Sequence, residues 1–341
     1  MIQLLQTNGQ AKLVVMENDL LRVQLTNFGA AIFSVQIKDE NGELDDIALT
    51  CDSLEAFVEN RNFYGATVGR VVNRIKNGHA EIGGKTYQLT LNDGNNSAHG
   101  GEASFAWKFW DTEVREDRVL FRLLSKDEEA GYPGNLQVEV EYRFDEDGAI
   151  LITHRGISDQ DTIMNMTNHT YWCLGGMDEK IYDQELFING RYYLEADDEL
   201  IPTGQILSVK DTPFDFTTPH AIKDHIFDQH PAIQRNRGYD ISYVRDGRER
   251  GLAARLRATS KGRILEVETT LPDIHIYTGN FLNHDPGKGG RSYTPHDAIC
   301  LEGERFPDAV NQPHFGHIFL RAGEEYLEQI RFCIKKEEKL L

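Results

Sequence analysis

Two residues far apart in the sequence, His169 and Glu302, have the chemical properties of a proton-transfer pair. Each lies in a dense motif of polar and aromatic residues, at 165–172 for the histidine and 301–313 for the glutamate. A side chain that donates a proton near neutral pH and a carboxylate that accepts one are enough to move protons on an uncharged substrate. If the fold brings the two together, the sequence predicts an acid–base enzyme that needs no cofactor.

Each of the two also has an ordinary structural interpretation. A histidine surrounded by Asn, Thr and Tyr residues, as His169 is, often serves as a hydrogen-bonded structural side chain. Glu302 follows the apolar run 298–301, which places it at the end of a buried strand. A carboxylate there is costly unless it is paired or used in chemistry, and this favours a functional role for Glu302.

Three further motifs contain side chains that can bind a polar ligand. Arg74, beside Asn73, offers five donors in a planar fork suited to hydroxyls or carboxylates, although a surface ion pair would explain it as well. His99 precedes two glycines that allow the backbone to approach a ligand closely. Asp240, two residues after Gly238, can orient a polyol, although Asp near Gly also suits a turn.

Several other kinds of site are not supported. The segment 287–290 lacks the spacing and the following helix of a phosphate-binding loop. No nucleophile elbow, zinc-protease motif or dinucleotide fingerprint occurs in a supporting context. The 12 histidines do not cluster as a metal set. We therefore expect neither a cofactor nor a metal.

The composition is that of a soluble globular protein, with 341 residues, 40% hydrophobic and 27% charged. The net charge of −19 disfavours nucleic acid, anionic membranes and highly anionic substrates as partners. No stretch approaches the roughly 20 apolar residues of a membrane span, and the N-terminus lacks a secretory signal. The cysteines, at 51, 173, 300 and 333, are widely spaced. We predict a cytoplasmic protein with reduced thiols.

The elements that must position these residues are mainly strands. Residues 136–144 alternate apolar and polar side chains, Asp147-Gly148 allows a tight turn, and 149–155 extend again, which predicts a β-hairpin. The same two-residue period occurs at 33–37 and 265–269. Further turn signals are Asn41-Gly42 and Asn77-Gly78.

Helices are expected to be few and short. Ser53 can cap a helix over 54–58, and Pro219 can open another over 221–226. No repeat, low-complexity tract or linker divides the chain. Residues 1–341 are therefore expected to form one large, mainly antiparallel all-β domain.

Taken together, these segments resemble the galactose mutarotase (aldose 1-epimerase) family from about residue 14 to residue 334. Each shared motif is weak alone, but their order along the chain is specific. The resemblance implies a large antiparallel β-sandwich, a super-sandwich, with a sugar cleft on one sheet. The shared motifs are Asn73-Arg74-Ile75, His99-Gly100-Gly101, Gly131-Tyr132-Pro133-Gly134, Asn168-His169-Thr170-Tyr171, Ile201-Pro202-Thr203-Gly204, Tyr277-Thr278-Gly279-Asn280-Phe281 and Phe306-Pro307-Asp308.

The resemblance also implies an isomerase that interconverts the α and β anomers of a free aldohexose such as galactose or glucose. Glu302 stands where the family has its catalytic base, and His169 where it has its catalytic acid. The base would take the C1-hydroxyl proton while a charged His169 protonates the ring oxygen, with Asp240 or Glu304 holding up the pKa of the histidine. The residues expected to line the sugar site are Arg74, Asn73, His99, Asp240, His275 and Tyr277.

Two positions depart from the family pattern. The family usually has Glu-Thr-Gln where this chain has Glu302-Gly303-Glu304, so a second carboxylate follows the base. On a strand it would face the same side as Glu302 and either raise the pKa of that residue or contact substrate. Cys173 stands where the family favours Asn. Both differences leave the sugar preference open.

Other classes remain open from the sequence alone. A hexose-6-phosphate 1-epimerase would need additional cationic groups, which a strongly acidic chain does not favour. A non-catalytic sugar-binding protein would keep the cleft without turnover. A glycoside hydrolase needs two carboxylates, for which Glu302 with Glu304 or Asp240 could serve. We expect a monomer, although a dimer is compatible with the sequence.

Overall fold

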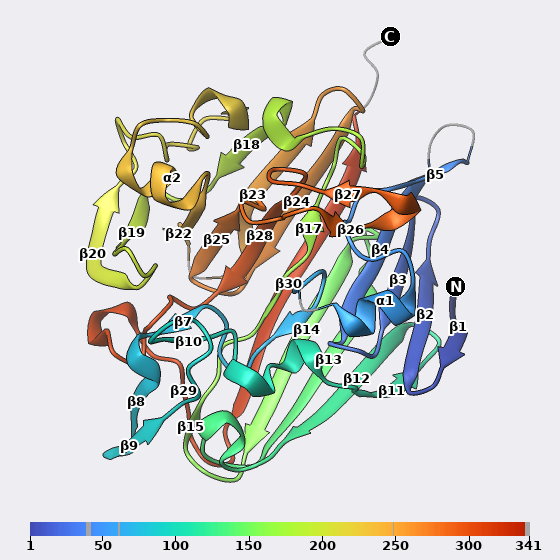
Figure 1. Ribbon diagram of the computed structural model, residues 1–341. Coiled ribbons are helices and arrows are strands. Elements are labelled where there is room, and N and C mark those ends of the chain that lie inside the picture. Colours follow the sequence, from blue (N-terminus) through green and yellow to red (C-terminus); the bar gives the residue numbers. More distant parts are fainter. Residues whose placement is uncertain (39–41, 61, 248, 338–341) are drawn as a thin grey trace.

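Antiparallel sheets dominate the computed structural model, which describes residues 1–38, 42–60, 62–247 and 249–337 (Figure 1). As predicted, Phe33, Val35 and Ile37 are buried along one strand of the N-terminal sheet. Asn41 of the predicted Asn41-Gly42 turn lies outside the described residues. The five strands of this sheet, in order, are β1 (Ile2–Asn8), β2 (Ala11–Glu17), β3 (Leu21–Thr26), β4 (Ala31–Lys38) and β5 (Leu44–Asp46).

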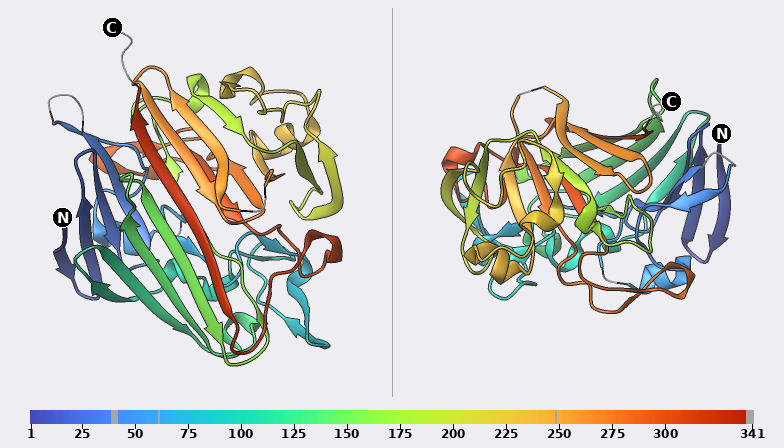
Figure 2. Two further views of the ribbon diagram at one scale, coloured as in Figure 1. Left: turned by 180° about the vertical axis from the view of Figure 1, so that it is seen from behind. Right: turned by 90° about the horizontal axis from the view of Figure 1, so that it is seen from above.

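The second sheet has nine strands, and β30 crosses its middle when it is seen from behind (Figure 2). The predicted hairpin is formed by β13 and β14, which pair without a break. The alternation predicted at 265–269 is confirmed, because buried and half-buried residues alternate along β24. The strands, in order across the sheet, are β11 (Asp111–Val114), β12 (Arg118–Ser125), β13 (Leu136–Phe144), β14 (Ile150–Ser158), β30 (Glu325–Lys336), β24 (Arg263–Thr269), β23 (Gly251–Ala258), β18 (Glu185–Ile188) and β21 (His220–Ala221).

The third sheet carries most of the predicted site. Its pairing places His275 opposite Glu302 and Asp273 opposite Glu304 on neighbouring strands, β25 and β28. All six residues of β28 are buried. The strands of this sheet, in order, are β17 (Tyr171–Trp172), β28 (Ile299–Glu304), β25 (Asp273–Tyr277), β22 (Asp240–Val244), β19 (Tyr192–Ala196) and β20 (Pro202–Ser208).

Short two-stranded ribbons carry the loops that complete the site. Asn77 and Gly78 both have positive φ angles, of 54° and 58°, so the predicted turn there is confirmed. The ribbons are β6 (Thr67–Val68) with β16 (Thr167–Asn168), β7 (Arg74–Ile75) with β10 (Ser97–Ala98), β8 (His79–Ile82) with β9 (Lys85–Gln88), β15 (Thr162–Ile163) with β29 (Phe319–Leu320), and β26 (Asp285–Pro286) with β27 (Ser292–Tyr293).

Helices are few and short, as predicted. The Ser53 hydroxyl accepts the Ala56 N–H at 3.2 Å and caps α1 (Leu54–Glu59). The helix predicted over 221–226 is wrong, because residues 220–221 pair with β18 at the sheet edge and only a single 3-10 turn follows. No helix in the described ranges has both the length and the apolarity needed to cross a membrane. The second α-helix is α2 (Pro231–Asn236), and the 3-10 turns are η1 (Lys76–Gly78), η2 (Gly101–Ala103), η3 (Phe105–Trp107), η4 (Glu129–Gly131), η5 (Ile181–Asp183), η6 (Ile222–Asp224), η7 (Lys288–Gly290) and η8 (Pro313–Phe315).

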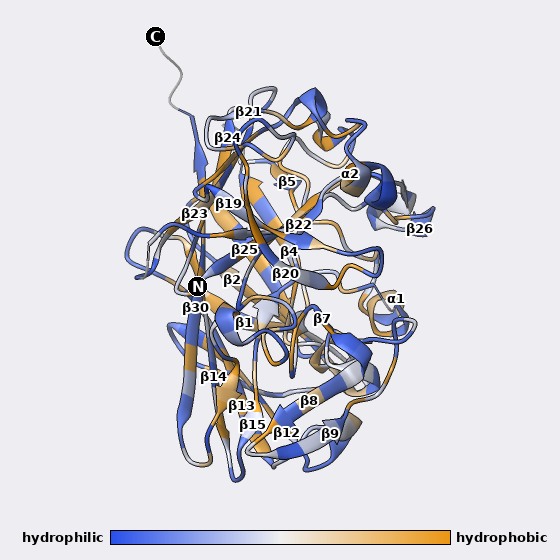
Figure 3. Cartoon of the chain, turned by 90° about the vertical axis from the view of Figure 1, so that its left-hand side faces the viewer, coloured by the Kyte–Doolittle hydropathy of each residue, from blue (hydrophilic) through white to orange (hydrophobic). Residues whose placement is uncertain are grey.

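A continuous hydrophobic core joins the three large sheets. Trp172 of β17 packs edge to face on Phe332 of β30, with ring centroids 5.0 Å apart. Tyr142 of β13 donates its hydroxyl to the Ala30 carbonyl beside the N-terminal sheet, at 2.7 Å. Hydrophobic and hydrophilic residues alternate along many strands, because one face of each strand is buried (Figure 3). The predicted all-β antiparallel sandwich with a few short helices is confirmed.

Candidate active site

A cavity of about 180 Å³ brings together all eight residues selected from the sequence. Three strands of the third sheet, β22, β25 and β28, contribute five of the lining residues. The others come from the segments around β7, β10 and β17 and from the loops that contain Phe63 and Phe281. The lining residues are Phe63, Val72, Asn73, Arg74, His99, His169, Tyr171, Asp240, His275, Tyr277, Phe281, Glu302 and Glu304.

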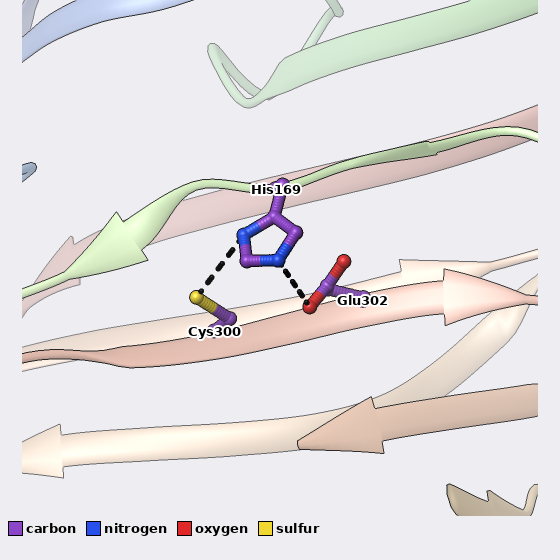
Figure 4. Close-up of side chains that lie close together, drawn as sticks. All are labelled: His169, Cys300 and Glu302. Atoms are coloured by element: carbon purple, nitrogen blue, oxygen red, sulfur yellow. Dashed lines mark hydrogen bonds and ion pairs between the residues drawn. The ribbon is translucent and has the colours of Figure 1, made fainter. Parts of the chain in front are cut away.

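His169 and Glu302 face each other in this cavity (Figure 4). The imidazole Nε2 lies 3.5 Å from Glu302 Oε1, and the two residues are 5% and 2% exposed. The backbone of His169 is fixed on both sides, since its N–H donates to the Ala66 carbonyl and its carbonyl accepts the Gly65 N–H, both at 2.9 Å. Its ring stacks with Tyr171 at a centroid distance of 5.1 Å. The fold thus holds an imidazole and a carboxyl group in a fixed facing geometry.

Burial determines the charge of this pair. Burial raises the pKa of Glu302 well above its usual value, and the nearby carboxylates of Glu304 and Asp240 raise it further. Burial also lowers the pKa of His169 to about 4. These shifts favour the uncharged forms of both groups, whereas a charged pair was expected from the sequence. The neutral pair, a carboxylic acid beside an imidazole, holds the same number of protons as the ion pair, a carboxylate beside an imidazolium. Transfer of one proton from Glu302 to His169 across the 3.5 Å gap therefore converts the first form into the second.

A second polar pair in the cavity is formed by His275 and Asp240. The His275 Nε2 lies 3.0 Å from Asp240 Oδ1, and its Nδ1 lies 2.9 Å from the Ser242 hydroxyl. Burial alone would lower the pKa of His275, but the hydrogen bond to Asp240 and the charge of Glu304 outweigh it and raise that pKa. Burial would likewise raise the pKa of Asp240, but His275 lowers it. Both shifts favour the charged forms, so the contact stabilises an imidazolium beside a carboxylate.

Arg74 and His99 present donors to the cavity. The Arg74 Nε donates to Asp93 at 2.7 Å, so the ion pair considered as its ordinary role is present. No hydrogen bond to another described residue engages its two terminal nitrogens, which leaves them for a ligand. His99 Nδ1 accepts the backbone N–H of Asn73 at 3.3 Å. Burial lowers the pKa of His99 well below its usual value, so the neutral ring carries its proton on Nε2.

Glu304 lies in the same cavity as Glu302, as expected for alternate residues of one strand. Its Oε1 accepts a hydrogen bond from Asn73 Nδ2 at 3.0 Å. Burial raises the pKa of Glu304 to about 8, and the buried Asp273 on β25 adds to this shift. Cys173, the other departure from the family pattern, lies outside the cavity, with its Sγ 4.0 Å from the Asp46 carbonyl.

The glycines after His99 have a different role from the one expected. A Cβ on Gly100 would lie 2.0 Å from the Gly69 carbonyl oxygen, and one on Gly101 would lie 2.2 Å from the Thr90 hydroxyl. Both glycines therefore allow close packing of the protein against itself. Neither belongs to the cavity lining.

Five residues at the site were missed from the sequence, one of which is Val72 of the cavity lining. Phe63, Tyr171 and Phe281 give the cavity an aromatic lining, and Cys300 lies 3.5 Å from the second nitrogen of His169. Tyr171 belongs to the histidine motif, so its position in that motif was a usable signal. Phe281 likewise ends the shared motif that begins at Tyr277, and Cys300 lies two residues before Glu302. The proximity of Phe63 to the site depends on tertiary structure.

Three groups with metal-ligating atoms approach one another within the described chain, namely His169, Cys300 and Glu302, all within 4.8 Å. The sulfur approaches Nδ1 of the imidazole and the carboxylate approaches Nε2 (Figure 4). A metal ion bound to Nδ1 would lie near the sulfur but on the other side of the ring from the carboxylate. An ion bound to Nε2 would lie near the carboxylate but on the other side of the ring from the sulfur. The set does not fit a tetrahedral metal ion.

This fold and cavity are those of an acid–base enzyme for a small, uncharged polyhydroxylated ligand. The chain belongs to the aldose 1-epimerase family, whose family model matches residues 12–333. Galactose mutarotase from Bos taurus is 40% identical over 321 residues, covering 93% of this chain and 92% of the relative. Aldose 1-epimerase from Escherichia coli K12 is 34% identical over 329 residues, covering 94% and 95%.

Solved structures agree with this assignment. The GalM/aldose epimerase homologue from C. elegans has a TM-score of 0.89 and 28% identity, covering 96% of this chain and 100% of that one. Galactose 1-epimerase from Lactobacillus acidophilus has a TM-score of 0.87 and 28% identity, covering 99% of each chain. The predicted aldose 1-epimerase, an isomerase with a sugar substrate, is confirmed. The monomeric state, the cytoplasmic location and the exclusion of nucleic acid and membranes stay predictions.

Proposed function

We propose that this protein interconverts the α and β anomers of free galactose and glucose, with Glu302 and His169 transferring the protons. The observation that carries this proposal is the buried approach of His169 Nε2 to Glu302 Oε1, at 3.5 Å, inside a cavity lined by hydrogen-bond donors and acceptors. Relatives named galactose mutarotase, at up to 40% identity, favour galactose as one of the substrates.

Substrate binding prepares the pair for reaction. The C1 hydroxyl of the sugar donates a hydrogen bond to Glu302, which stabilises the carboxylate form of that residue. The Glu302 proton then passes to His169 Nε2, and the neutral pair becomes a base and an acid. This transfer needs no change in the number of protons in the site, so it can occur across a wide pH range.

Ring opening and closure use the same two groups. Glu302 takes the proton of the C1 hydroxyl, His169 gives its Nε2 proton to the ring oxygen, and the bond from C1 to the ring oxygen breaks. The resulting aldehyde rotates about the C1–C2 bond and presents its other face. The protons return by the reverse steps, which gives the opposite anomer. Acid and base catalysis each contribute about 10²–10⁴-fold.

The remaining polar groups hold the rest of the sugar while C1 moves. Arg74 offers its terminal nitrogens and His99 its Nε2–H as donors, whereas Asp240 accepts. The ion pair between Asp240 and His275, at 3.0 Å, fixes the acceptor in place. Such positioning lowers the entropy cost of reaching the transition state.

Polarimetry tests the proposal directly. Freshly dissolved α-D-galactose and α-D-glucose should approach their usual final rotations faster with the protein, and the final rotations should not change. Matched solutions without protein measure the spontaneous rate in the same buffer. Unchanged rates for both sugars would contradict the proposal, and the 6-phosphorylated hexoses and a chromogenic glycoside would then test the competing classes.

The pH dependence of kcat/KM follows from the shared proton of the pair. Below about pH 4 His169 also becomes protonated, and Glu302 can no longer act as a base. Above the raised pKa of Glu302 the pair holds no transferable proton, and the acid is lost. We expect a bell-shaped profile with its acid limb near pH 4 and its alkaline limb at the raised pKa of Glu302, both belonging to the coupled pair.

Stopped-flow polarimetry at constant ionic strength measures this profile, with the buffer-catalysed rate subtracted at each pH. An alkaline limb at the usual pKa of a glutamate would contradict the neutral resting pair, because Glu302 would then ionise like an exposed carboxyl group. Glu304→Gln should move the alkaline limb to lower pH, since the charge of Glu304 contributes to the raised pKa of Glu302.

Glu304→Gln should also change the pH dependence of stability. The pKa of Glu304 rises from 4.5 to about 8 on folding, so its stabilising contribution is complete below pH 4.5 and is lost as the pH rises toward 8. The amide keeps an oxygen for Asn73. We expect the variant to match the parent near pH 4.5 and to exceed it by roughly 2–4 kcal/mol at alkaline pH. Urea unfolding at both pH values measures this, and a variant equally or less stable than the parent at the alkaline pH would contradict it.

A further inference from the structure

Cys300 lies behind His169, on the side away from the cavity. Its Sγ is 3.5 Å from His169 Nδ1, whereas Nε2 of the same ring faces Glu302 (Figure 4). Cys300 and Glu302 are alternate residues of β28, so their side chains leave the strand on the same face. The cysteine is fully buried and does not line the cavity. It therefore contacts the proposed acid without reaching the sugar.

The proposed reaction places a strict demand on this histidine. Nε2 must carry a proton when the ring oxygen is protonated and must have a free lone pair when that proton returns. Since a neutral imidazole carries one N–H, Nε2 is free only when the N–H lies on Nδ1. The group beside Nδ1 therefore decides whether His169 is ready to exchange protons in the cavity.

We propose that Cys300 is a positioning residue, whose sulfur accepts the Nδ1–H of His169 and so reserves Nε2 for proton exchange with Glu302 and the sugar. This inference rests on the proposed function, because it assigns His169 as the acid. Tyr171, which pairs with Cys300 across β17 and β28, stacks on the imidazole at 5.1 Å. The stacked ring fixes the plane of the imidazole, and the sulfur fixes its orientation within that plane.

A thiol suits this role better than the carboxylate that often orients a catalytic histidine. A carboxylate stabilises the imidazolium and makes it a weaker acid. The thiol is a weak acceptor, and burial raises the pKa of Cys300 well above its usual value, so the sulfur stays uncharged. Burial lowers the pKa of His169 to about 4, and the uncharged sulfur does not oppose that shift. The protonated form of His169 is therefore acidic enough to protonate a weakly basic ring oxygen.

Substitutions at Cys300 test the contribution to turnover. Cys300→Ala removes the acceptor and should lower kcat by about 10-fold or more while KM changes by less than about threefold. Cys300→Ser keeps an acceptor and should recover most of the lost kcat. Cys173→Ala is the matched control, because Cys173 belongs to the same buried apolar cluster and its described contacts do not include His169. Its kcat should equal that of the parent.

Nitrogen-15 NMR of the histidine rings measures the tautomer of His169 independently of catalytic activity. The signal of His169 is assigned as the one that is missing from the spectrum of His169→Asn. Near neutral pH the parent should show the Nδ1–H tautomer at His169, Cys300→Ser should keep it, and Cys300→Ala should shift it toward Nε2–H. An Nε2–H tautomer in the parent would overturn the inference, as would an unchanged tautomer and kcat in Cys300→Ala. A parent with the expected tautomer but no mutarotation would overturn the proposed function instead, and with it the catalytic purpose of the contact.

Discussion

Glu302→Gln is expected to lower kcat for galactose mutarotation by about 10³–10⁴-fold, the upper part of the range for losing a general base. The amide has nearly the same shape as the carboxyl group and still accepts a hydrogen bond from the C1 hydroxyl. It cannot accept the proton itself, so the ring would not open through this residue. Sugar binding should be nearly unchanged. Stopped-flow polarimetry gives kcat, and equilibrium titration with galactose gives the dissociation constant.

The neighbouring carboxyl group provides the control for this result. Glu304→Gln makes the same chemical change two residues further along β28, in the same cavity. The amide oxygen introduced there can still accept from Asn73, so kcat should fall by less than about 10-fold. Equal losses in the two variants would contradict the assignment of Glu302 as the base and would indicate a general effect of carboxyl removal on the cavity.

His169→Asn should lower kcat by about 10²–10⁴-fold because it removes the only proposed donor to the ring oxygen. The acid limb of the pH profile near pH 4 should also disappear, since that limb reflects protonation of the imidazole. Asn is small and polar, so the backbone hydrogen bonds of residue 169 to Ala66 and Gly65 can remain. The kinetic measurements are the same as for Glu302→Gln, extended across pH.

An exposed histidine serves as the matched control. His79→Asn makes the same substitution on β8, outside the cavity, and should leave kcat and the pH profile unchanged. If His169→Asn kept its acid limb, the protonation that ends activity at low pH would belong to another group. His275 would then be examined next, because it is another imidazole of the cavity and its pKa is raised.

Local sequence patterns were sufficient for many elements of the fold. The β13–β14 hairpin and the alternating burial of β24 follow from residues that are near one another in the chain. Ser53 likewise caps α1 through a contact three residues away. The helix predicted after Pro219 failed because pairing at the sheet edge, a contact with the distant strand β18, competes with local helix preference.

The sequence by itself, through its own motifs and the family resemblance, identified eight of the residues that gather in the cavity. Tertiary structure decided their charge. Burial raises the pKa of Glu302 and lowers that of His169, and the extent of burial depends on three packed sheets rather than on neighbours in the chain. The contact of Cys300 with His169 was likewise set by the pairing of β17 with β28, because strand register joins residues that no local pattern connects.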